Sequence, residues 1–266
     1  MTTITTTTTS AAAAPALPPI ALVTGATRGL GRSAARHLAR AGIGVIGTYR
    51  SSKDEAVAFT DEVREHGVPA AALPLDLGDS GTFAGFAGSV RAALAGFGAT
   101  SLRYLLNNAG AGLYAPFDRT AEEPFDELFR VQVKGPFFLT RALLPLIADG
   151  GRILNVSSGL ARFTLPGYSA YAAAKGAVEV LTRYQAAELA PRGIRVNVLA
   201  PGAIATDFGG GLVRDDAGVN AAVAGTIALG RVGRADDIGA AVPHLLSDDL
   251  GWANGTRIEL SGGQHL

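Results

Sequence analysis

Residues 20–31 read IALVTGATRGLG, an aliphatic run that passes directly into a turn with glycines at positions 25, 29 and 31. A chain that turns from a strand into a helix needs glycine where no Cβ fits, and also where the backbone approaches a pyrophosphate beside the helix N-terminus. The spacing is T-G-x-x-x-G-x-G, which differs from the G-x-G-x-x-G fingerprint. Its place directly after the first strand predicts a dinucleotide cradle.

Short apolar strands alternate with longer helical stretches from this turn to the end of the chain. Strands are expected at residues 20–24, 44–49, 70–75, 102–107, 152–156, 195–199 and 257–260, and helices at 30–41, 53–66, 81–97, 122–147, 168–190 and 235–246. This alternation is typical of a parallel sheet that is covered on both faces and wound right-handed. The sequence therefore predicts an α/β fold over residues 20–266, a single doubly wound Rossmann-like domain with a seven-stranded parallel sheet flanked by helices.

The composition argues against several classes of function. Lys and Arg together number 23, as do Asp and Glu, so the formal net charge is zero and neither nucleic acid nor an anionic membrane surface is an expected partner. The chain has no cysteine, which excludes disulfides, thiolate metal sites and cysteine nucleophiles. Its four histidines lie far apart without metal-ligand spacing, so no metal site is predicted.

The first nineteen residues are rich in threonine, then in alanine and proline, and carry no charged side chain. Prolines interrupt the only apolar part, unlike the unbroken apolar core of a secretory signal. Such a segment has too little apolar surface to fold, so residues 1–19 are predicted to be a disordered tail. No uncharged apolar run approaches the length of a membrane-spanning helix. We therefore expect a cytoplasmic protein without a membrane partner.

Residues 171–175 read YAAAK, and Ser158 lies thirteen residues before the tyrosine. Tyr171 and Lys175 are one helical turn apart, so their side chains share a face of the helix. Tyrosine can give a proton to a carbonyl oxygen, and a neighbouring ammonium favours the phenolate that the reverse reaction needs. An ordinary helix-surface pair is the alternative interpretation. Ser157 and Tyr168 are the alternative serine and tyrosine.

Taken in order, these motifs resemble the short-chain dehydrogenase/reductase family, and within it the beta-ketoacyl carrier-protein reductase-like branch. The resemblance covers about residues 20–263. It implies an oxidoreductase that transfers a hydride between a nicotinamide and a small-molecule carbonyl or secondary alcohol. It further implies that Ser158 orients the substrate oxygen and that Tyr171 is the general acid/base. Lys175 is then expected to lower the pKa of Tyr171 and to hold the nicotinamide ribose.

The resemblance also implies which residues bind the cofactor. Asp76 matches the acid that touches the adenine, residues 107–110 (NNAG) match the motif that borders the adenosine ribose, and Pro201-Gly202 begins the segment that holds the nicotinamide carboxamide. The full expected set is Gly25, Thr27, Arg28, Gly29, Leu30, Gly31, Arg50, Asp76, Leu77, Asn108, Ala109, Gly110, Tyr171, Lys175, Pro201, Gly202, Ile204 and Thr206.

The end of the second expected strand indicates which nicotinamide cofactor is used. A site that prefers NAD usually carries Asp or Glu there for the ribose hydroxyls, but residues 47–52 read GTYRSS. Arg28 and Arg50 can together bind a 2′-phosphate through charge-assisted hydrogen bonds. NADP, as NADPH, is therefore the expected cofactor and NAD the less favoured one. Two solvated surface arginines are the alternative interpretation.

One catalytic position departs from the family pattern. Gln132 stands where the family usually has an asparagine, which bends the long helix and holds a water that links the lysine to solvent. Gln132 keeps the amide and adds a methylene, so the proton relay is the step in question. A compensated active enzyme and one of reduced activity both stay open. The second leaves room for an NADP(H)-binding sensor or scaffold, and a lyase or isomerase relative is a third possibility.

The resemblance places a mobile lid over the substrate at residues 203–230, and the repeated glycine at 209–211 suits a hinge. Candidate pocket walls are Leu113, Tyr114, Phe163 and Leu165, with ordinary core packing as the alternative. The expected pocket has no evident charged group to bind a substrate carboxylate, although Arg162 lies nearby. This absence favours a neutral ketone or alcohol as the substrate. Many family members are tetramers built partly on the two long helices, so a homotetramer is expected.

Overall fold

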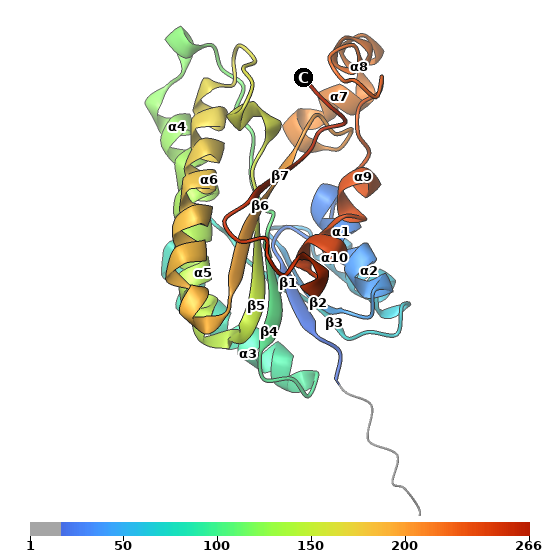
Figure 1. The fold of residues 1–266 in the computed structure, drawn as a ribbon, viewed down its shortest axis with the longest axis vertical. Coiled ribbons are helices and arrows are strands. Elements are labelled where there is room, and N and C mark those ends of the chain that lie inside the picture. The colour runs from blue at the N-terminus through green and yellow to red at the C-terminus, as the bar shows by residue number, and fades with distance from the viewer. Residues whose placement is uncertain (1–16) are drawn as a thin grey trace, which may run out of the picture.

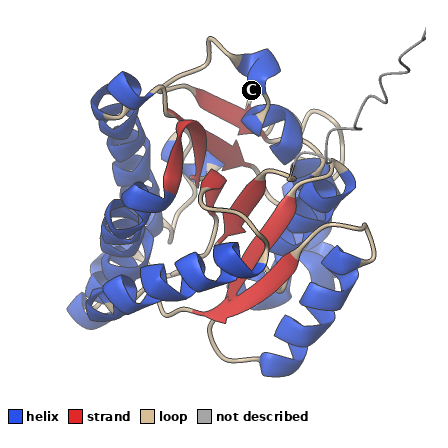
Figure 2. Cartoon of the chain, turned by 90° about the horizontal axis from the view of Figure 1, so that it is seen from below, coloured by secondary structure: helices blue, strands red, loops and turns tan. Residues whose placement is uncertain are grey.

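A seven-stranded parallel sheet lies between two layers of helices (Figures 1 and 2). The computed structural model describes residues 17–266, so the expected disordered tail falls outside the described residues up to residue 16. The strands are β1 (Ile20–Val23), β2 (Gly44–Tyr49), β3 (Ala70–Pro74), β4 (Leu102–Asn107), β5 (Ile147–Val156), β6 (Arg195–Pro201) and β7 (Arg257–Leu260). The predicted doubly wound α/β architecture is confirmed.

The strand order is β3-β2-β1-β4-β5-β6-β7, so the direction of winding reverses between β1 and β4. In doubly wound sheets, ligands bind beyond the carboxyl ends of the strands at this reversal. The glycine turn follows β1. Of residues 107–110, the first ends β4 and the other three follow it. The topology therefore brings two of the predicted cofactor motifs to the expected edge.

Alternate strand residues face opposite layers of helices, as in any pleated sheet. In β1, Ile20 and Leu22 pack with the core beneath α3, α5 and α6, while Ala21 and Val23 pack with the core beneath α1, α2 and α10. The helices are α1 (Gly29–Arg40), α2 (Lys53–Arg64), α3 (Phe83–Gly96), α4 (Glu122–Phe129), α5 (Gly135–Leu143), α6 (Ser169–Glu188), α7 (Leu212–Asp215), α8 (Ala217–Ala224), α9 (Ala235–Gly239) and α10 (Val242–Leu246).

The helix expected at residues 122–147 was wrong in its continuity and its end. The chain forms α4, then a π-helical turn over Arg130–Lys134, and then α5, which ends at Leu143. Pro136 and Pro145 lack the N–H that would continue the regular ladder, so the helix widens before the first and ends before the second. A 3₁₀ turn over Leu144–Leu146 follows, and β5 begins at Ile147 and not at the expected residue 152.

The last predicted helix, residues 235–246, is also divided. It consists of α9 and α10, and Pro243 lies in the first turn of α10. Proline at that place cannot donate a hydrogen bond to the carbonyl of Gly239, so the two helices do not fuse. Within residues 17–266, no helix combines the length and apolarity that crossing a bilayer requires.

Candidate active site

The turn between β1 and α1 has the shape that a pyrophosphate requires. Gly25 and Gly29 have φ of 64° and 55°, and a Cβ on Gly31 would lie 2.1 Å from the carbonyl oxygen of Gly25. The side chain of Arg28, which precedes α1, does not cap the helix, and the first turn holds no acidic residue. The N–H groups at this end of α1 therefore suit an anion.

A hydrogen-bonded brace joins this turn to the loop after β4. The hydroxyl oxygen of Thr24 accepts from the backbone N–H of Asn108 at 2.9 Å and of Ala109 at 3.0 Å. The Asn108 side chain in turn donates to the carbonyl oxygen of Thr24 at 2.9 Å. Thr24 begins the glycine motif identified in the sequence, but it was not among the predicted cofactor-binding residues and its bracing contacts were not predicted. The signal available was a threonine at the end of an otherwise apolar strand.

A second buried chain of side chains leads from β4 through β5 to α6. The Asn107 amide donates to Asn155 Oδ1 at 2.8 Å, and the Asn155 amide donates to Thr182 Oγ1 at 2.9 Å. Asn155 was also missed, although it is the polar residue within the apolar strand Ile153–Val156. This chain holds α6, which carries Tyr171 and Lys175, against the sheet.

The structure brings Ser158, Tyr171 and Lys175 together beyond the carboxyl end of β5. The Ser158 side chain lies close enough to the Tyr171 phenol to lower its pKa. Lys175 Nζ lies 5.7 Å from the centroid of the Tyr171 ring and donates to the carbonyl oxygen of Val156 at 2.9 Å. Ser158 Oγ also accepts from the Leu160 N–H at 3.2 Å, which fixes the serine at the start of a short turn.

Burial controls the protonation of Tyr171 and Lys175 in the protein alone. Burial raises the pKa of the Tyr171 phenol well above its ordinary value, and the neighbouring Ser158 side chain offsets only part of this rise. Burial lowers the pKa of Lys175 to about 7. Without a cofactor the phenol therefore keeps its proton, which is the form that protonates a ketone oxygen. The expected lowering of the Tyr171 pKa by Lys175 is not found in this state.

Replacing Lys175 with methionine is expected to stabilise the cofactor-free protein at low pH. Because the pKa of Lys175 in the folded protein, about 7, lies below its ordinary value of 10.5, the unfolded chain binds more protons between these values. The destabilisation of the folded protein by the buried ammonium is thus complete below pH 7 and disappears as the pH rises toward 10.5. The difference corresponds to roughly 5 kcal/mol as an upper bound.

Chemical denaturation at pH 6 and pH 9.5 measures this effect. The unfolding free energy of Lys175→Met should exceed that of the parent at the lower pH, and the difference should shrink at the higher pH. Lys53→Met, which changes an exposed lysine, is the control and should show no such pH dependence. An equal difference between Lys175→Met and the parent at both pH values would contradict the assignment.

Gln132 lies in the π-helical turn and is buried. Its amide nitrogen donates to the carbonyl oxygen of Ala111, and a Cβ on Gly110 would lie 2.7 Å from that nitrogen. The side chain therefore holds the backbone of the loop after β4. The bond to Ala111 uses one of the two N–H groups of this amide, so a water could still accept from the other or donate to the amide oxygen of Gln132. The catalytic role of Gln132 stays a prediction.

The residues predicted to recognise the adenosine half lie at the surface. Arg28 and Arg50 are exposed, and neither forms an ion pair within the part of the chain that the structure describes. Asp76 is exposed and its carboxylate accepts from the Gly78 N–H at 2.8 Å. A carboxylate that sequence reasoning did not consider, that of Glu55 on α2, lies 3.5 Å from the Thr27 hydroxyl.

The segment after β6 carries the remaining expected residues. Pro201 ends β6, and the Gly202 N–H donates to the Leu260 carbonyl at 3.1 Å, which ties this segment to β7. Ile204 bridges to Gly233, and Thr206 lies close to Gly29 of the cradle. Leu30 and Leu77 are half-buried and buried, respectively, beside the expected binding edge.

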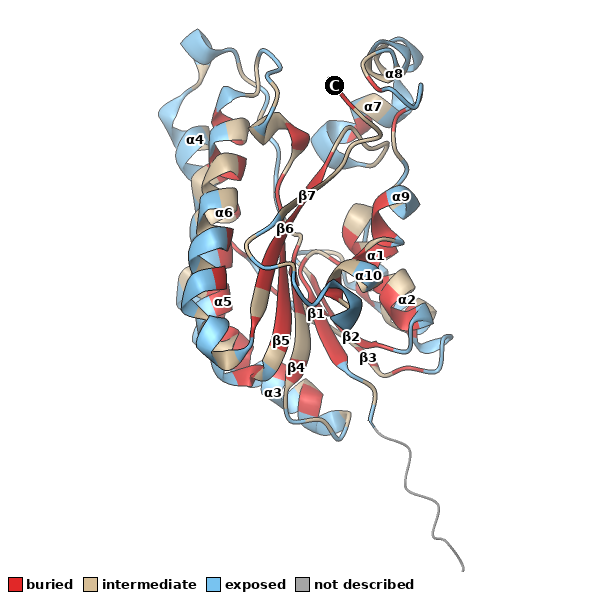
Figure 3. Ribbon diagram, in the orientation of Figure 1, coloured by how far each residue is buried: buried red, intermediate tan, exposed pale blue. Residues whose placement is uncertain are grey.

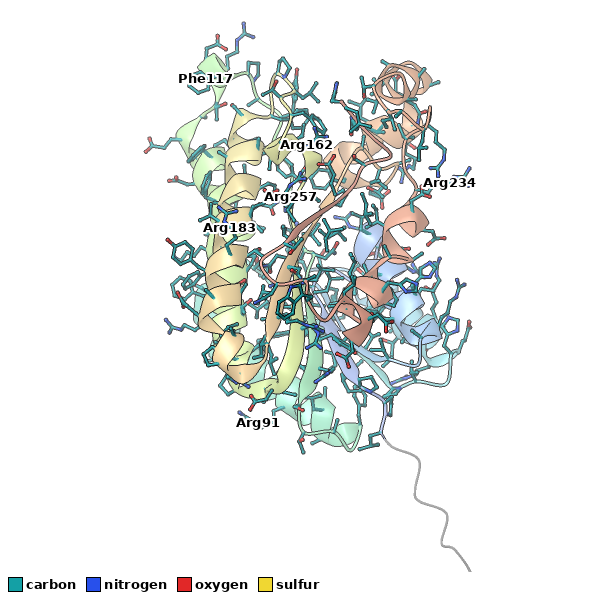
Figure 4. The ribbon with its side chains drawn as sticks, viewed as in Figure 1. Arg91, Phe117, Arg162, Arg183, Arg234 and Arg257 are labelled. Carbon is teal, nitrogen blue, oxygen red and sulfur yellow. The ribbon has the colours of Figure 1, made fainter. Side chains whose placement is uncertain are left out.

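Four aromatic side chains form a continuous row beside the predicted acid, which we call the aromatic row: Tyr114, Tyr168, Tyr171 and Phe208. The centroids of successive rings are 5.3, 6.5 and 5.7 Å apart. Phe208 lies within residues 203–230, the predicted lid, and three glycines with φ of 63°, 77° and 78° follow it. Arg162 is bound by Glu259 at 2.7 and 2.8 Å, so it is not free to clamp a substrate. Figure 4 shows Arg162 close to Arg257.

A family model described as enoyl-(acyl carrier protein) reductase matches residues 25–265 of the chain. The chain belongs to the short-chain dehydrogenase/reductase family. The predicted family is thereby confirmed, and the protein is an oxidoreductase of this family. Within residues 17–266, no group of three or more His, Cys, Asp or Glu residues is arranged to hold a metal ion.

Three relatives illustrate what this family member is similar to. The 3-oxoacyl-[acyl-carrier-protein] reductase FabG of Staphylococcus aureus is 34% identical over 92% of the chain and 98% of FabG. The hydroxynaphthalene reductase-like protein Arp2 of Metarhizium brunneum is 32% identical over 92% of the chain and 94% of Arp2. The structure of the angucycline C-6 ketoreductase LanV with bound NADP has a TM-score of 0.88 and 34% identity, and the match covers 94% of this chain and 96% of LanV.

Proposed function

We propose that this short-chain dehydrogenase/reductase reduces a ketone to a secondary alcohol with NADPH. The observation that carries the proposal is the meeting of Ser158, Tyr171 and Lys175 at the sheet edge that also holds the glycine cradle. The names of FabG and LanV describe reductases of oxo or keto groups, and LanV was crystallised with NADP. Both facts support a ketone substrate and NADP(H).

The proposed chemistry divides between the cofactor and this chain. Bound NADPH supplies the hydride that the carbonyl carbon receives. Ser158 hydrogen-bonds the carbonyl oxygen, and Tyr171 gives its phenolic proton to that oxygen as negative charge develops on it. The Lys175 ammonium beside the ring stabilises the resulting phenolate, which solvent then reprotonates. The buried, protonated phenol found in the protein alone is the state that begins this reduction.

We propose that the cofactor lies along the expected set of residues. The cradle and the N-terminus of α1 would hold the pyrophosphate, and the exposed Arg28 and Arg50 would hold the 2′-phosphate. Lys175 would contact the nicotinamide ribose, and the segment from Pro201 to Thr206 would contact the carboxamide. The lid at residues 203–230 would close over the substrate from Phe208 onward.

The experiment that tests the proposed reaction is NADPH consumption in the presence of ketones. NADPH should be consumed only when both a ketone and the protein are present, with one alcohol formed for each NADPH oxidised. Tight NADPH binding without turnover on any ketone would contradict the proposal and favour the sensor or scaffold interpretation.

We further propose that the ketone is conjugated to a flat aromatic ring system. The aromatic row leads from the surface at Tyr114 to the proton donor Tyr171, so an aryl group can stack along it while its carbonyl reaches Ser158. The backbone also supports the row, because a Cβ on Gly167 would lie 2.3 Å from the Tyr114 ring. Arp2 is named a hydroxynaphthalene reductase-like protein. Naphthalene is a fused aromatic ring system, so this name agrees with the proposed class.

Replacing Tyr114 with leucine is expected to lower kcat/KM for 1-tetralone about tenfold and to change kcat/KM for 2-octanone less than about twofold. An aromatic contact contributes about 0.5–1.5 kcal/mol beyond burial of area, and only the aryl ketone makes it. Phe117→Leu is the matched control, since Phe117 lies on the same segment and is 86% exposed (Figure 4). Equal losses with both ketones would contradict the proposed aryl substrate.

We propose a homotetramer built on the outer surfaces of α5 and α6. These surfaces face away from the sheet and are largely exposed (Figure 3). They carry the large apolar side chains of Phe137, Val180 and Tyr184 at the surface. Exposed apolar groups that gather on two adjacent helices support contact with a second copy of this chain.

A further inference from the structure

Three arginines converge at the amino end of the sheet, opposite to the active-site edge. Arg103 lies at the start of β4, Arg152 in β5 and Arg195 at the start of β6, and Arg152 and Arg195 are direct neighbours across the two strands. In Figure 1 this end of β4 and β5 lies near α3. Six residues separate Arg152 from Ser158, so the arginines are roughly 20 Å from the proposed chemistry.

The arginines line a pocket of about 360 Å³, which we call the basal arginine pocket. Its lining residues are Arg103, Gly150, Arg152, Ala190, Gly193, Ile194, Arg195, Gly251 and Asn254. No lining residue is acidic. The volume lies at the lower end of the range typical of small-molecule sites.

The charges around the basal arginine pocket do not balance. The nearest carboxylate is that of Asp248, whose Oδ1 accepts from Arg103 and Arg195 at 3.4 Å each and also from Arg152. Three guanidinium groups against one carboxylate leave two positive charges. The Asp248 side chain is 73% exposed, so much of its charge is solvated. The carboxylate of Asp149 binds Arg192 at 2.8 Å.

Two of the guanidinium groups are also incompletely hydrogen-bonded. Arg152 is only 7% exposed, and Nε of Arg152 and Nε of Arg195 are buried without a hydrogen-bond partner among the described residues. Burial and the like charge of Arg195 lower the pKa of Arg152. Buried donors and charges without partners are costly, and an anion bound beside the guanidinium groups would offset part of that cost.

Glycines leave room for such a ligand. A Cβ on Gly150 would lie 3.2 Å from Arg103 Nη1, and a Cβ on Gly251 would lie 3.0 Å from Arg195 Nη1. Larger residues at these positions would press on the guanidinium groups. Arg152 Nη1 already donates to the carbonyl oxygens of Gly150 and Gly151, so a ligand would meet mainly Arg103 and Arg195.

We propose that the basal arginine pocket binds a phosphate group, either as the free ion or on a small metabolite. A phosphate dianion matches the two uncompensated positive charges, and its oxygens suit the paired N–H groups of guanidinium. The ligand would join β4, β5 and β6 to the segment that carries Asp248. It would therefore raise the stability of the domain from outside the active site.

Thermal unfolding in sodium phosphate and in sodium chloride of equal ionic strength tests the proposal. Phosphate should raise the melting temperature of the parent by several degrees more than chloride does. Arg103→Gln should abolish this extra shift; the Arg103 side chain is 31% exposed, so the variant should fold. Arg91→Gln, which changes an exposed arginine of α3 (Figure 4), should keep the shift.

The proposed cofactor site also takes phosphate groups, so it needs its own control. The double variant Arg28→Ser/Arg50→Ser should keep the phosphate-specific shift of the parent. Loss of the shift in this variant, or its persistence in Arg103→Gln, would overturn the basal arginine pocket as the site.

Asp248→Asn separates an anion site from a purely structural clamp. Without the carboxylate the three arginines repel one another, so the melting temperature without phosphate should fall, while the shift produced by phosphate should grow. A structural clamp predicts the same fall with an unchanged shift, and that result would overturn the proposal. Glycerol 2-phosphate distinguishes the sources: an equal shift assigns a phosphate monoester, and a shift with inorganic phosphate alone assigns the free ion.

Discussion

Replacing Tyr171 with phenylalanine is expected to lower kcat/KM for ketone reduction by NADPH at least about a hundredfold, the scale expected for the loss of a general acid. Phenylalanine keeps the ring that packs beside Tyr168 and Phe208, so the aromatic row should stay in place. The variant loses only the hydroxyl that gives the proton. Initial rates measured over a range of ketone and NADPH concentrations give the loss.

The neighbouring tyrosine provides the matched control for this experiment. Tyr168 lies in the same aromatic row, and burial raises its pKa as well, but it lacks a lysine one turn later. Tyr168→Phe should keep kcat within a few-fold of the parent, and both variants should bind NADPH as the parent does. A larger loss in Tyr168→Phe than in Tyr171→Phe would transfer the role of proton donor to Tyr168.

The double variant Arg28→Ser/Arg50→Ser is expected to lose about a hundredfold in kcat/KM for NADPH. A hydrogen bond to a charged group contributes about 1.5–3 kcal/mol, so two such contacts to the 2′-phosphate are sufficient for this loss. NADH has no 2′-phosphate, so its kcat/KM should change only a few-fold. Initial rates with each cofactor at a fixed ketone concentration measure the change in preference.

The exposed Arg40, at the other end of α1, supplies the control for removal of positive charge. Arg40→Ser should leave the preference for NADPH unchanged. A parent protein that prefers NADH would contradict the role of Arg28 and Arg50. Equal losses with both cofactors in the double variant would contradict it as well, and would point to a general effect on the cradle.

The strands were predicted well because each buries a short apolar run, and such runs are visible in the sequence. The interruption of the helix at residues 122–147 was not predicted, since its apolar spacing continues through the π-helical turn at Arg130–Lys134. Pro136 and Pro145 were the available signals. Gln132, which departs from the family pattern, lies inside that turn, so the local bend does not require asparagine.

The site was predictable where a motif is contiguous in the chain, as in the glycine turn and residues 171–175. A contact that forms only in the folded protein was missed: Thr24 and Asn108 are 84 positions apart, and their hydrogen bonds follow from the pairing of β1 with β4. Burial was missed for the same reason. The sequence indicated that Lys175 is near Tyr171, but only the structure shows that both are buried enough for desolvation to control their pKa values.

Transfer of deuterium from C4-deuterated NADPH to a ketone tests the central claim most directly. The parent protein, incubated with 1-tetralone and each of the two C4-labelled epimers of NADPH in turn, should produce alcohol with deuterium on the carbinol carbon from one epimer. Tyr171→Phe should produce at least about a hundredfold less labelled alcohol in the same time. NADPH that binds tightly but passes no deuterium to 1-tetralone, 2-octanone or any other ketone tested would contradict the account and leave a binding protein in place of a reductase.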